Sequence, residues 1–183
     1  TMLILVTGGA ASGKSELAEN LAVSLNKGKM AYIATMLAED EESRLRVLKH
    51  RRMREGKNFE TIEAPYNLSA YSRHLTGYDT ALLECLTNLI ANEMFHGGKS
   101  GTETIEEIST ACRMLNQTVD KLIIVSGIVL SGFMPYDLFT EEYIRVLGCL
   151  NSSIGREADV VLETVCAIPI IHKGKDILQG ERV

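Results

Sequence analysis

The segment "GGAASGKS", residues 8–15, constrains what this chain can fold into more than any other feature of it. Gly8, Gly13, Lys14 and Ser15 satisfy the pattern G-x-x-x-x-G-K-[ST], in which successive backbone N–H groups converge on phosphate. The pattern follows the apolar run "LILVT" and opens "KSELAENLAVSL", whose apolar residues recur at helical spacing. A strand, a glycine-rich loop and a helix in this order predict a nucleoside triphosphate site. The alternative is a glycine turn with a chance Lys-Ser.

The residue types of this loop suit the parts of a triphosphate and its metal ion. The Lys14 side chain is long enough to reach the β- and γ-phosphates, and the Ser15 hydroxyl is a ligand for Mg²⁺. Glu84 lies at the end of the apolar run "TALLEC", where a carboxylate can complete such a metal site. The alternative for Glu84 is a strand-end acid that faces solvent. The loop residues expected to contact the nucleotide are Gly8, Gly9, Ala10, Ala11, Ser12, Gly13, Lys14 and Ser15.

The rest of the chain alternates between short apolar runs and amphipathic stretches. Apolar runs typical of strands lie at 3–7, 30–35, 58–64, 80–85, 121–126, 159–165 and 167–171. Helical spacing is found at 14–25, 39–54, 103–117 and 138–157, whereas 86–102 has no clear pattern. This alternation predicts an α/β fold of the P-loop NTPase kind, a mostly parallel sheet with helices on both faces. Without a linker or repeat, residues 1–183 are expected to form a single nucleotide-binding domain.

Composition and charge argue against several classes of protein. The formal net charge of −5 and a pI near 5.4 disfavour a nucleic-acid binder, which needs a broad basic surface. The longest uncharged apolar stretch is about 13 residues, shorter than the roughly 20 that span a bilayer. The start "MLILVTGG" lacks the pattern of a secretory leader. The four cysteines form no CxxC pair and are expected to be reduced, mostly buried thiols, so we expect a cytoplasmic protein.

The segment "RLRVLKHRRMR", residues 44–54, concentrates six of the 19 basic residues around His50. It could be a solvated helix face or, less readily in an acidic chain, a nucleic-acid patch. On a helix, Arg46, His50 and Arg54 lie one above another, because they are four residues apart. Positive neighbours favour a neutral imidazole, and arginines bind phosphate through paired N–H groups. The arrangement therefore also suits a histidine that attacks phosphorus, with Arg46 and Arg54 neutralising the phosphate.

Taken with the phosphate loop, this segment resembles the bifunctional adenosylcobinamide kinase / adenosylcobinamide-phosphate guanylyltransferases of cobalamin biosynthesis. The phosphate loop alone is shared by many families, so the histidine segment and the order of the motifs carry the resemblance. The similar segments, in the family's order, are "ILVTGGAASGKSELAE", "YIAT", "RVLKHRRMR", "ETIEAP", "LLECLTN" and "LGCLN…AD".

The resemblance implies two reactions and a set of residues that serve them. In the first, ATP or GTP gives its γ-phosphate to the hydroxyl of adenosylcobinamide. In the second, His50 attacks the α-phosphate of GTP, releases pyrophosphate and passes GMP to the cobinamide phosphate. Lys14 and Glu84 act with His50 as the catalytic residues, and a homotrimer is implied. The further residues implied to contact the nucleotide are Ala34, Thr35, Met36, Arg51, Arg52, Met53, Arg54, Glu63 and Glu84.

One segment departs from the family. Its members usually carry Asn-Glu-Val-Gly before a Gly-x-x-Pro, whereas here Gly127 and Ile128 replace the Asn and Glu, and Gly132 and Pro135 remain. Two other functions stay open on these residues. A different small-molecule kinase on the same scaffold would not need His50. A regulatory protein that binds a nucleotide without catalysis would fit the missing polar pair.

Overall fold

Seven strands form one sheet in the computed structural model, which describes residues 1–128 and 137–178, and for Arg46 the backbone alone. The strand order is β3-β2-β4-β5-β1-β6-β7. Neighbouring strands are parallel except β6 and β7, which are antiparallel. The expected α/β fold with a mostly parallel sheet is confirmed. The strands are β1 (Met2–Gly8), β2 (Met30–Ala34), β3 (Phe59–Glu63), β4 (Thr80–Glu84), β5 (Lys121–Val125), β6 (Val160–Val165) and β7 (Ile168–Lys173).

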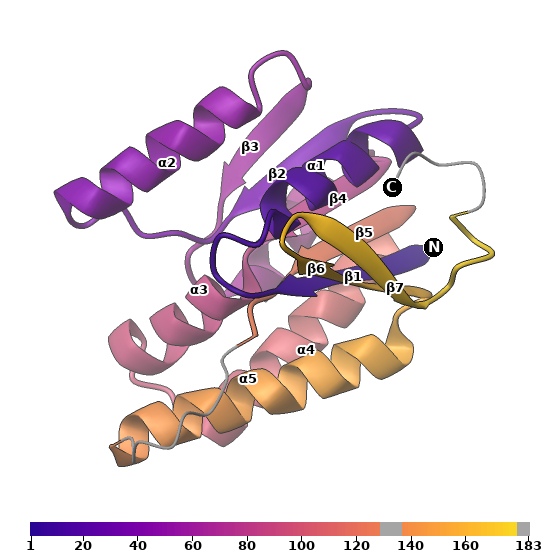
Figure 1. Cartoon of the computed structure of the whole chain (residues 1–183). Helices are drawn as coiled ribbons and strands as arrows, with labels where there is room; N and C mark the ends of the chain where they lie inside the picture. Colours follow the sequence, from indigo (N-terminus) through magenta and orange to yellow (C-terminus); the bar gives the residue numbers. More distant parts are fainter. Residues whose placement is uncertain (129–136, 179–183) are drawn as a thin grey trace.

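Helices cover both faces of the sheet, and unequally (Figure 1). On one face α1 packs against β1, β4, β5 and β6. On the other face lie α3, α4 and α5 together with the 3-10 helix η1, whereas α2 stands beside the edge strand β3. The helices are α1 (Lys14–Leu25), α2 (Glu41–Met53), η1 (Leu68–Leu75), α3 (Leu86–Ala91), its π-helical continuation η2 (Asn92–His96), α4 (Gly101–Thr118) and α5 (Leu138–Glu157).

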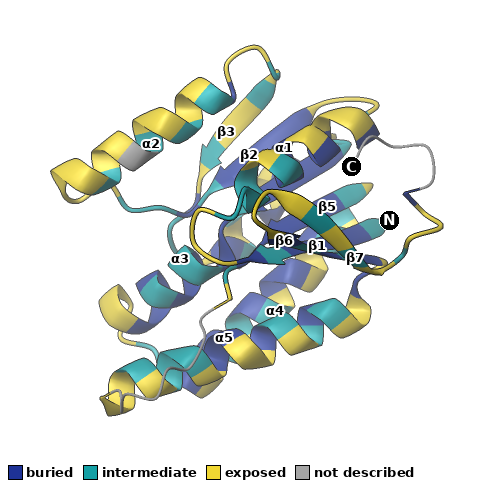
Figure 2. Ribbon diagram, viewed as in Figure 1, coloured by how far each residue is buried: buried dark blue, intermediate teal, exposed yellow. Residues whose placement is uncertain are grey.

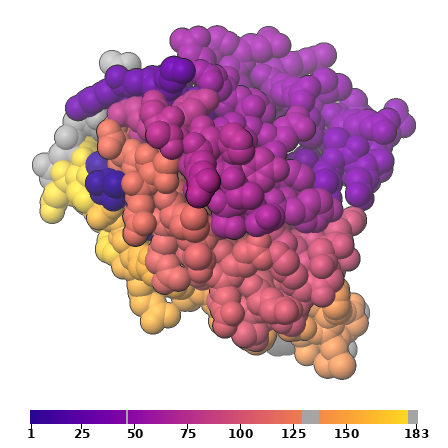
Figure 3. All heavy atoms as spheres, turned by 180° about the vertical axis from the view of Figure 1, so that it is seen from behind, coloured from indigo at the N-terminus to yellow at the C-terminus, as the bar shows by residue number. Residues whose placement is uncertain are grey.

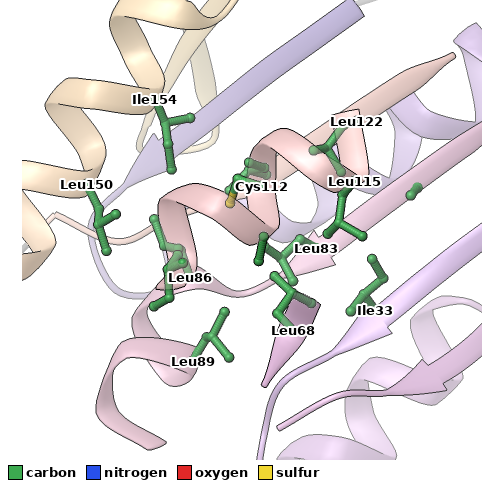
Figure 4. Packing of buried hydrophobic residues seen from close by; sticks show 14 of the residues in the cluster. Ile33, Leu68, Leu83, Leu86, Leu89, Cys112, Leu115, Leu122, Leu150 and Ile154 are labelled. Atoms are coloured by element: carbon green, nitrogen blue, oxygen red, sulfur yellow. The ribbon is translucent and has the colours of Figure 1, made fainter. Parts of the chain in front are cut away.

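The core consists of two apolar clusters separated by the sheet. The larger cluster joins the strands to α3, α4 and α5, and Figure 4 shows Leu83 of β4 among Leu86, Cys112 and Leu115. The smaller cluster lies under α1, which buries Ala18, Leu21 and Ala22 against the strands. Because side chains of a strand alternate between faces, buried parallel strands supply both clusters. Seen from behind, the residues from η1 to α4 form most of the visible surface (Figure 3).

The sequence predicted α2, which follows β2, but not α3, which follows β4. Acidic Glu41 and Glu42 begin α2 and basic residues end it, which complements the helix dipole as expected. Asp40 caps its N-terminus by accepting a hydrogen bond from the Ser43 N–H. The unclear stretch 86–102 contains α3 and η2, which are too short to give a full amphipathic repeat.

Most of the surface of α2 is exposed (Figure 2). Its side chains Leu45 and Leu48 are 60% and 49% exposed, and none of the described side chains of α2 belongs to either core cluster. The helix is therefore held at its ends and by a few polar contacts rather than by a buried apolar stripe. None of the described helices is long and apolar enough to cross a membrane.

The four cysteines divide evenly between interior and surface. Cys85 and Cys112 are buried, and Cys149 and Cys166 are exposed. All four are free thiols in the described structure, as expected. The expectation that they are mostly buried holds for two of them only.

Replacing Leu83 by alanine should destabilise the protein because it leaves a cavity in the central strand of the larger core. We expect the free energy of unfolding to fall by about 2–5 kcal/mol, measured by urea denaturation. The matched control is Leu48→Ala on the exposed side of α2, for which we expect a change of no more than about 0.5 kcal/mol. Equal losses in the two variants would contradict the assigned core.

Candidate active site

The loop after β1 folds so tightly that a side chain at position 8 would not fit. A Cβ on Gly8 would lie 2.4 Å from Ser12 Oγ and 2.8 Å from the Thr164 carbonyl oxygen. Gly13 precedes α1 with φ at 93°, in the left-handed region that glycine adopts without strain. The backbone N–H groups at the start of α1 have no helical acceptor, so the loop presents donors and the helix dipole to an anion.

The turn between β6 and β7 supports this loop from the side. The Ala167 N–H donates to the Ser12 carbonyl oxygen at 2.9 Å. Lys14 Nζ donates to the Gly9 carbonyl oxygen at 3.1 Å and so lies back over the loop. Ser12 Oγ is enclosed and has no hydrogen-bond partner among the described residues. Gly9, Ala10 and Ala11 are exposed, which leaves the loop's outer rim open to a ligand.

Glu84 connects the end of β4 to the phosphate loop. Its Oε1 accepts a hydrogen bond from Ser15 Oγ at 2.8 Å, while Oε2 is enclosed and has no partner among the described residues. Burial raises the pKa of Glu84 to about 7, although the Ser15 hydrogen bond and the charge of Lys14 oppose the rise. A hydroxyl beside an enclosed, unpaired carboxylate oxygen is a donor set that suits Mg²⁺.

The segment after β2 fixes the strand end that carries Glu84. The Thr35 hydroxyl donates to the Cys85 carbonyl oxygen and accepts from the Cys85 N–H, both at 2.8 Å. Asn92 Nδ2 donates to the Thr35 carbonyl oxygen at 2.7 Å. Thr35 is fully buried, so its polar groups hold β2 and β4 together, while its neighbours Ala34 and Met36 line the adjoining cavity.

That cavity has a volume of about 340 Å³ and brings together residues that are far apart in the chain. His50 of α2 and Glu84 of β4 both line it, and Glu84 leads on to the phosphate loop. The wall comes from β2, α2, β3, β4, α3 and the loops between them: Tyr32, Ala34, Met36, Leu37, Ala38, Val47, His50, Arg51, Arg54, Thr61, Glu63, Pro65, Glu84 and Asn88.

The surroundings of His50 keep its imidazole neutral. Burial lowers the pKa of His50 below its ordinary value of 6.5, and Glu19 opposes this shift. The charges of Arg54, Lys49 and Lys14 act in the same direction as burial, with smaller effect. The neutral imidazole was predicted from the sequence on the basis of the neighbouring arginines, whereas burial is the larger cause of the lowered pKa. A neutral imidazole retains the lone pair that a nucleophile requires.

Arginines of α2 hold fixed positions at the cavity. The guanidinium carbon of Arg54 lies 3.5 Å from the centroid of the Tyr32 ring, a cation–π contact, and the residue is only 8% exposed. Arg51 donates to Glu63 Oε1 at 3.0 Å across the gap between α2 and β3. Both partners of that ion pair are largely exposed, so it orients the side chains more than it stabilises the fold.

Other residues expected at the nucleotide lie elsewhere or outside the described atoms. Arg52 and Met53 border a separate hollow on the outer side of α2 with Leu45 and Leu48. Successive helical residues are rotated by about 100° around the helix axis, so Arg52, two residues after His50, faces nearly the opposite side of α2. The Arg46 side chain lies outside the described residues, and its predicted role stays a prediction.

The segment that departs from the family continues past the end of β5. The Ile128 N–H donates to the Gly8 carbonyl oxygen at 3.1 Å, so this backbone runs beside the phosphate loop. A Cβ on Gly127 would lie 2.9 Å from Thr87 Cγ2, a contact that leaves no room for the expected asparagine without a shift. Gly132 and Pro135 lie outside the described residues.

A buried acid paired with a lysine was not expected from the sequence. Glu19 of α1 is 0% exposed, and its Oε2 accepts a hydrogen bond from Lys57 Nζ at 2.8 Å. The available signal was its position four residues after Ser15, inside the apolar face of the helix. An acid on the core face of a helix is rare unless it is paired.

A phosphate loop after β1, with an acid on β4 bonded to its serine, defines a P-loop nucleotide-binding protein. Residues 4–171 match the model of the cobinamide kinase / cobinamide phosphate guanyltransferase family. The chain belongs to that family. It is therefore a kinase and guanylyltransferase of cobalamin biosynthesis.

Individual relatives agree in length as well as in sequence. The bifunctional adenosylcobalamin biosynthesis protein CobP of Pseudomonas aeruginosa is 31% identical, with 94% of this chain and 98% of that protein covered. The bifunctional protein CobU of Escherichia coli is 28% identical, with 92% and 98% covered. Among solved structures, the flagellar accessory protein FlaH of Methanocaldococcus jannaschii is similar at a TM-score of 0.49 and 16% identity, with 94% and 78% covered.

The pKa of His50 can be measured directly by following its ring nitrogens by ¹⁵N NMR as the pH is changed. We expect a pKa below 6.5, because burial disfavours the imidazolium. In the unfolded chain the ring binds its proton at higher pH, so this contribution to stability is lost as the pH falls through 6.5 and below. His50→Gln assigns the signal by removing it. A pKa of 6.5 or higher would contradict the enclosed environment.

Proposed function

We propose that both reactions of the family use the site around Glu84 and the phosphate loop, with His50 as the nucleophile of the second. The observation that carries this proposal is the convergence of His50 and Glu84 on one cavity, with Glu84 bonded to Ser15. The sequence separates these residues widely, and a solvated basic helix face would not require them to meet.

In the transferase reaction an imidazole nitrogen of His50 attacks the α-phosphorus of GTP. The N–P bond forms as the bond from phosphorus to the bridging oxygen breaks, and pyrophosphate leaves with that electron pair. A phosphate oxygen of adenosylcobinamide phosphate then attacks the same phosphorus and returns the electron pair to His50. Arg54, which lies beside the cavity, is placed to neutralise charge on the phosphate, and Arg46 belongs to the same proposal.

In the kinase reaction the phosphate loop holds the triphosphate of ATP or GTP. The hydroxyl of adenosylcobinamide attacks the γ-phosphorus, the bond to the nucleoside diphosphate breaks, and the hydroxyl proton leaves to solvent or to a nearby base. No protein nucleophile is required, because positioning and charge neutralisation provide most of the acceleration in phosphoryl transfer. Lys14 and the backbone N–H groups of the loop supply that charge.

Ser15 and Glu84 would hold Mg²⁺ at this site. The unpaired Oε2 of Glu84 and the adjacent Ser15 hydroxyl fit a hard cation, which in such sites also binds phosphate oxygens and water. When bound, the ion neutralises phosphate charge.

A cytoplasmic homotrimer completes the proposal. The support for an oligomer is the resemblance, together with exposed apolar side chains on the described surface. Leu138, Phe139 and Ile168 are 84%, 51% and 65% exposed. Leu138 and Phe139 are adjacent at the start of α5, and contiguous apolar surface is typical of faces that contact another chain.

His50→Ala should separate the two reactions. We expect loss of the protein–GMP adduct and of guanylyl transfer, with phosphorylation of adenosylcobinamide largely retained, because only the second reaction uses a protein nucleophile. Intact-mass spectrometry after incubation with GTP and Mg²⁺ measures the adduct, which should be acid-labile and stable to alkali, as phosphoramidates are. Lys14→Ala is the comparison, and it should lose both reactions. An adduct on another residue, or none on the wild type, would refute the role of His50.

Glu84→Gln should retain the fold and lose most Mg²⁺-dependent turnover. The amide keeps the size of the side chain but removes the charge that a cation requires, so both reactions should slow by at least about tenfold. Mg²⁺ titrations of nucleotide binding and of turnover measure the effect, with Glu106→Gln, an exposed acid of α4, as the matched control. A rate within about twofold of the wild type would leave Glu84 without a metal role.

A further inference from the structure

Glu19 is a buried acid whose surroundings satisfy only half of its carboxylate. It lies on α1, four residues after Ser15, and is 0% exposed. Lys57 Nζ donates to its Oε2 at 2.8 Å, while Oε1 is enclosed and has no partner among the described residues. A buried carboxylate oxygen without a partner is destabilising, so an acid at this position calls for a role beyond the ion pair.

The contacts around Glu19 link α1 to the segment that follows α2. Lys57 follows α2 closely in sequence and reaches α1 through this ion pair. Arg54, one turn after His50, covers the ring of Tyr32, and Tyr32 packs in the same apolar cluster as the buried face of α1. His50 lines the same cavity as Tyr32 and Arg54 and feels the charge of Glu19, and its Nδ1 is also enclosed without a partner among the described residues.

We propose that Glu19 is a positioning residue for His50, whose carboxylate accepts a hydrogen bond from the Nδ1–H group and leaves Nε2 free to attack phosphorus. The inference rests on the proposed function, in which His50 becomes guanylylated. Each atom stands unpartnered in this structure, so a side-chain rotation that pairs Oε1 with Nδ1 would satisfy both buried groups with one hydrogen bond. Lys57 would keep the other carboxylate oxygen in place.

The chemistry of the adduct gives the carboxylate a second task. As Nε2 forms its bond to the α-phosphorus and pyrophosphate leaves, positive charge develops on the ring. Glu19 stabilises that charge or takes the Nδ1 proton onto Oε1. When GMP moves to the acceptor phosphate, the N–P bond breaks, its electron pair returns to Nε2, and the proton returns to Nδ1. No other reactant is consumed.

Among the largest contributions to the pKa of His50 from the described residues, that of Glu19 is the one that raises it. Burial, Arg54, Lys49 and Lys14 all lower it. The acids Glu63 and Glu84 also line the cavity. Glu19 thus counteracts an environment that would otherwise make the imidazole a weaker base. The charged groups around His50 are Lys49, Arg51 and Arg54 of α2, Glu19 and Lys14 of α1, Glu63 of β3 and Glu84 of β4.

Glu19→Gln tests the assignment, because the amide is the same size but its NH₂ group can donate to Nδ1 and so favour the wrong tautomer. We expect formation of the GMP adduct to slow by about 100-fold, with its acid limb moved to lower pH, while cobinamide phosphorylation changes by no more than about threefold. The ¹⁵N NMR spectrum of His50 should change from the Nδ1–H tautomer towards the Nε2–H tautomer. Glu16→Gln, an exposed acid of the same helix, is the matched control and should match the wild type in all three measurements.

An unchanged tautomer and pH profile in a folded Glu19→Gln protein would overturn the inference, as would equal losses of the two reactions. If Glu19→Gln does not fold, Glu19→Asp replaces it. This variant keeps the charge but is too short to reach Lys57 and Nδ1 together, so it should slow adduct formation more than phosphorylation, and equal slowing would refute the role. If the wild type forms no adduct, the proposed function fails, and the NMR comparison still decides whether Glu19 holds His50.

Discussion

Parallel pairing is the constraint on which the rest of the structure depends. The strands β1, β2, β4 and β5 run side by side in one direction, so their carboxyl ends meet at one edge of the sheet. The phosphate loop leaves that edge after β1, Thr35 after β2, and Glu84 ends β4. The hydrogen bond from Ser15 to Glu84 then joins segments that the strand β5 separates in the sheet. The loops that carry the site residues lie at this edge because each crossover helix returns the chain to the opposite edge before the next parallel strand begins.

The phosphate loop and His50 are carried by different parts of the fold, the first by the sheet and α1 and the second by the exposed helix α2. In the proposed function phosphate binding falls to the loop and to α1, which packs on the smaller core cluster. The histidine belongs to α2, which is joined to the body through the ion pairs Lys57–Glu19 and Arg51–Glu63 and the stacking of Arg54 on Tyr32. In the proposed function the two reactions use different phosphorus atoms of a nucleotide, so a nucleophile carried on a separate helix can serve one reaction without disturbing the other.

Much of the fold and part of the site follow from local patterns. The apolar runs and helical spacings locate all seven strands and the helices α1, α2, α4 and α5 to within a few residues. The pieces that were missed, η1, α3 and η2, are too short for periodicity to identify them. Placement of Arg52 on the outer side of α2, and of Thr35 inside the body, could not be read from a resemblance, since both depend on how a helix or strand end is rotated against its neighbours.

The sequence by itself determined the phosphate loop and the alternation of strands and helices that makes a parallel α/β sheet. It also carries, in order, the motifs around His50 by which the chain resembles its family. These are local or linear properties, fixed by glycine at tight approaches and by the period of apolar residues. Only the tertiary structure decided that His50 and Glu84 line one cavity, and that burial more than positive charge keeps the imidazole of His50 neutral. It also decided that Glu19 is buried with one carboxylate oxygen unpaired among the described residues. The physical reason is that desolvation and pairing depend on what packs around a group, which no single segment of the chain specifies.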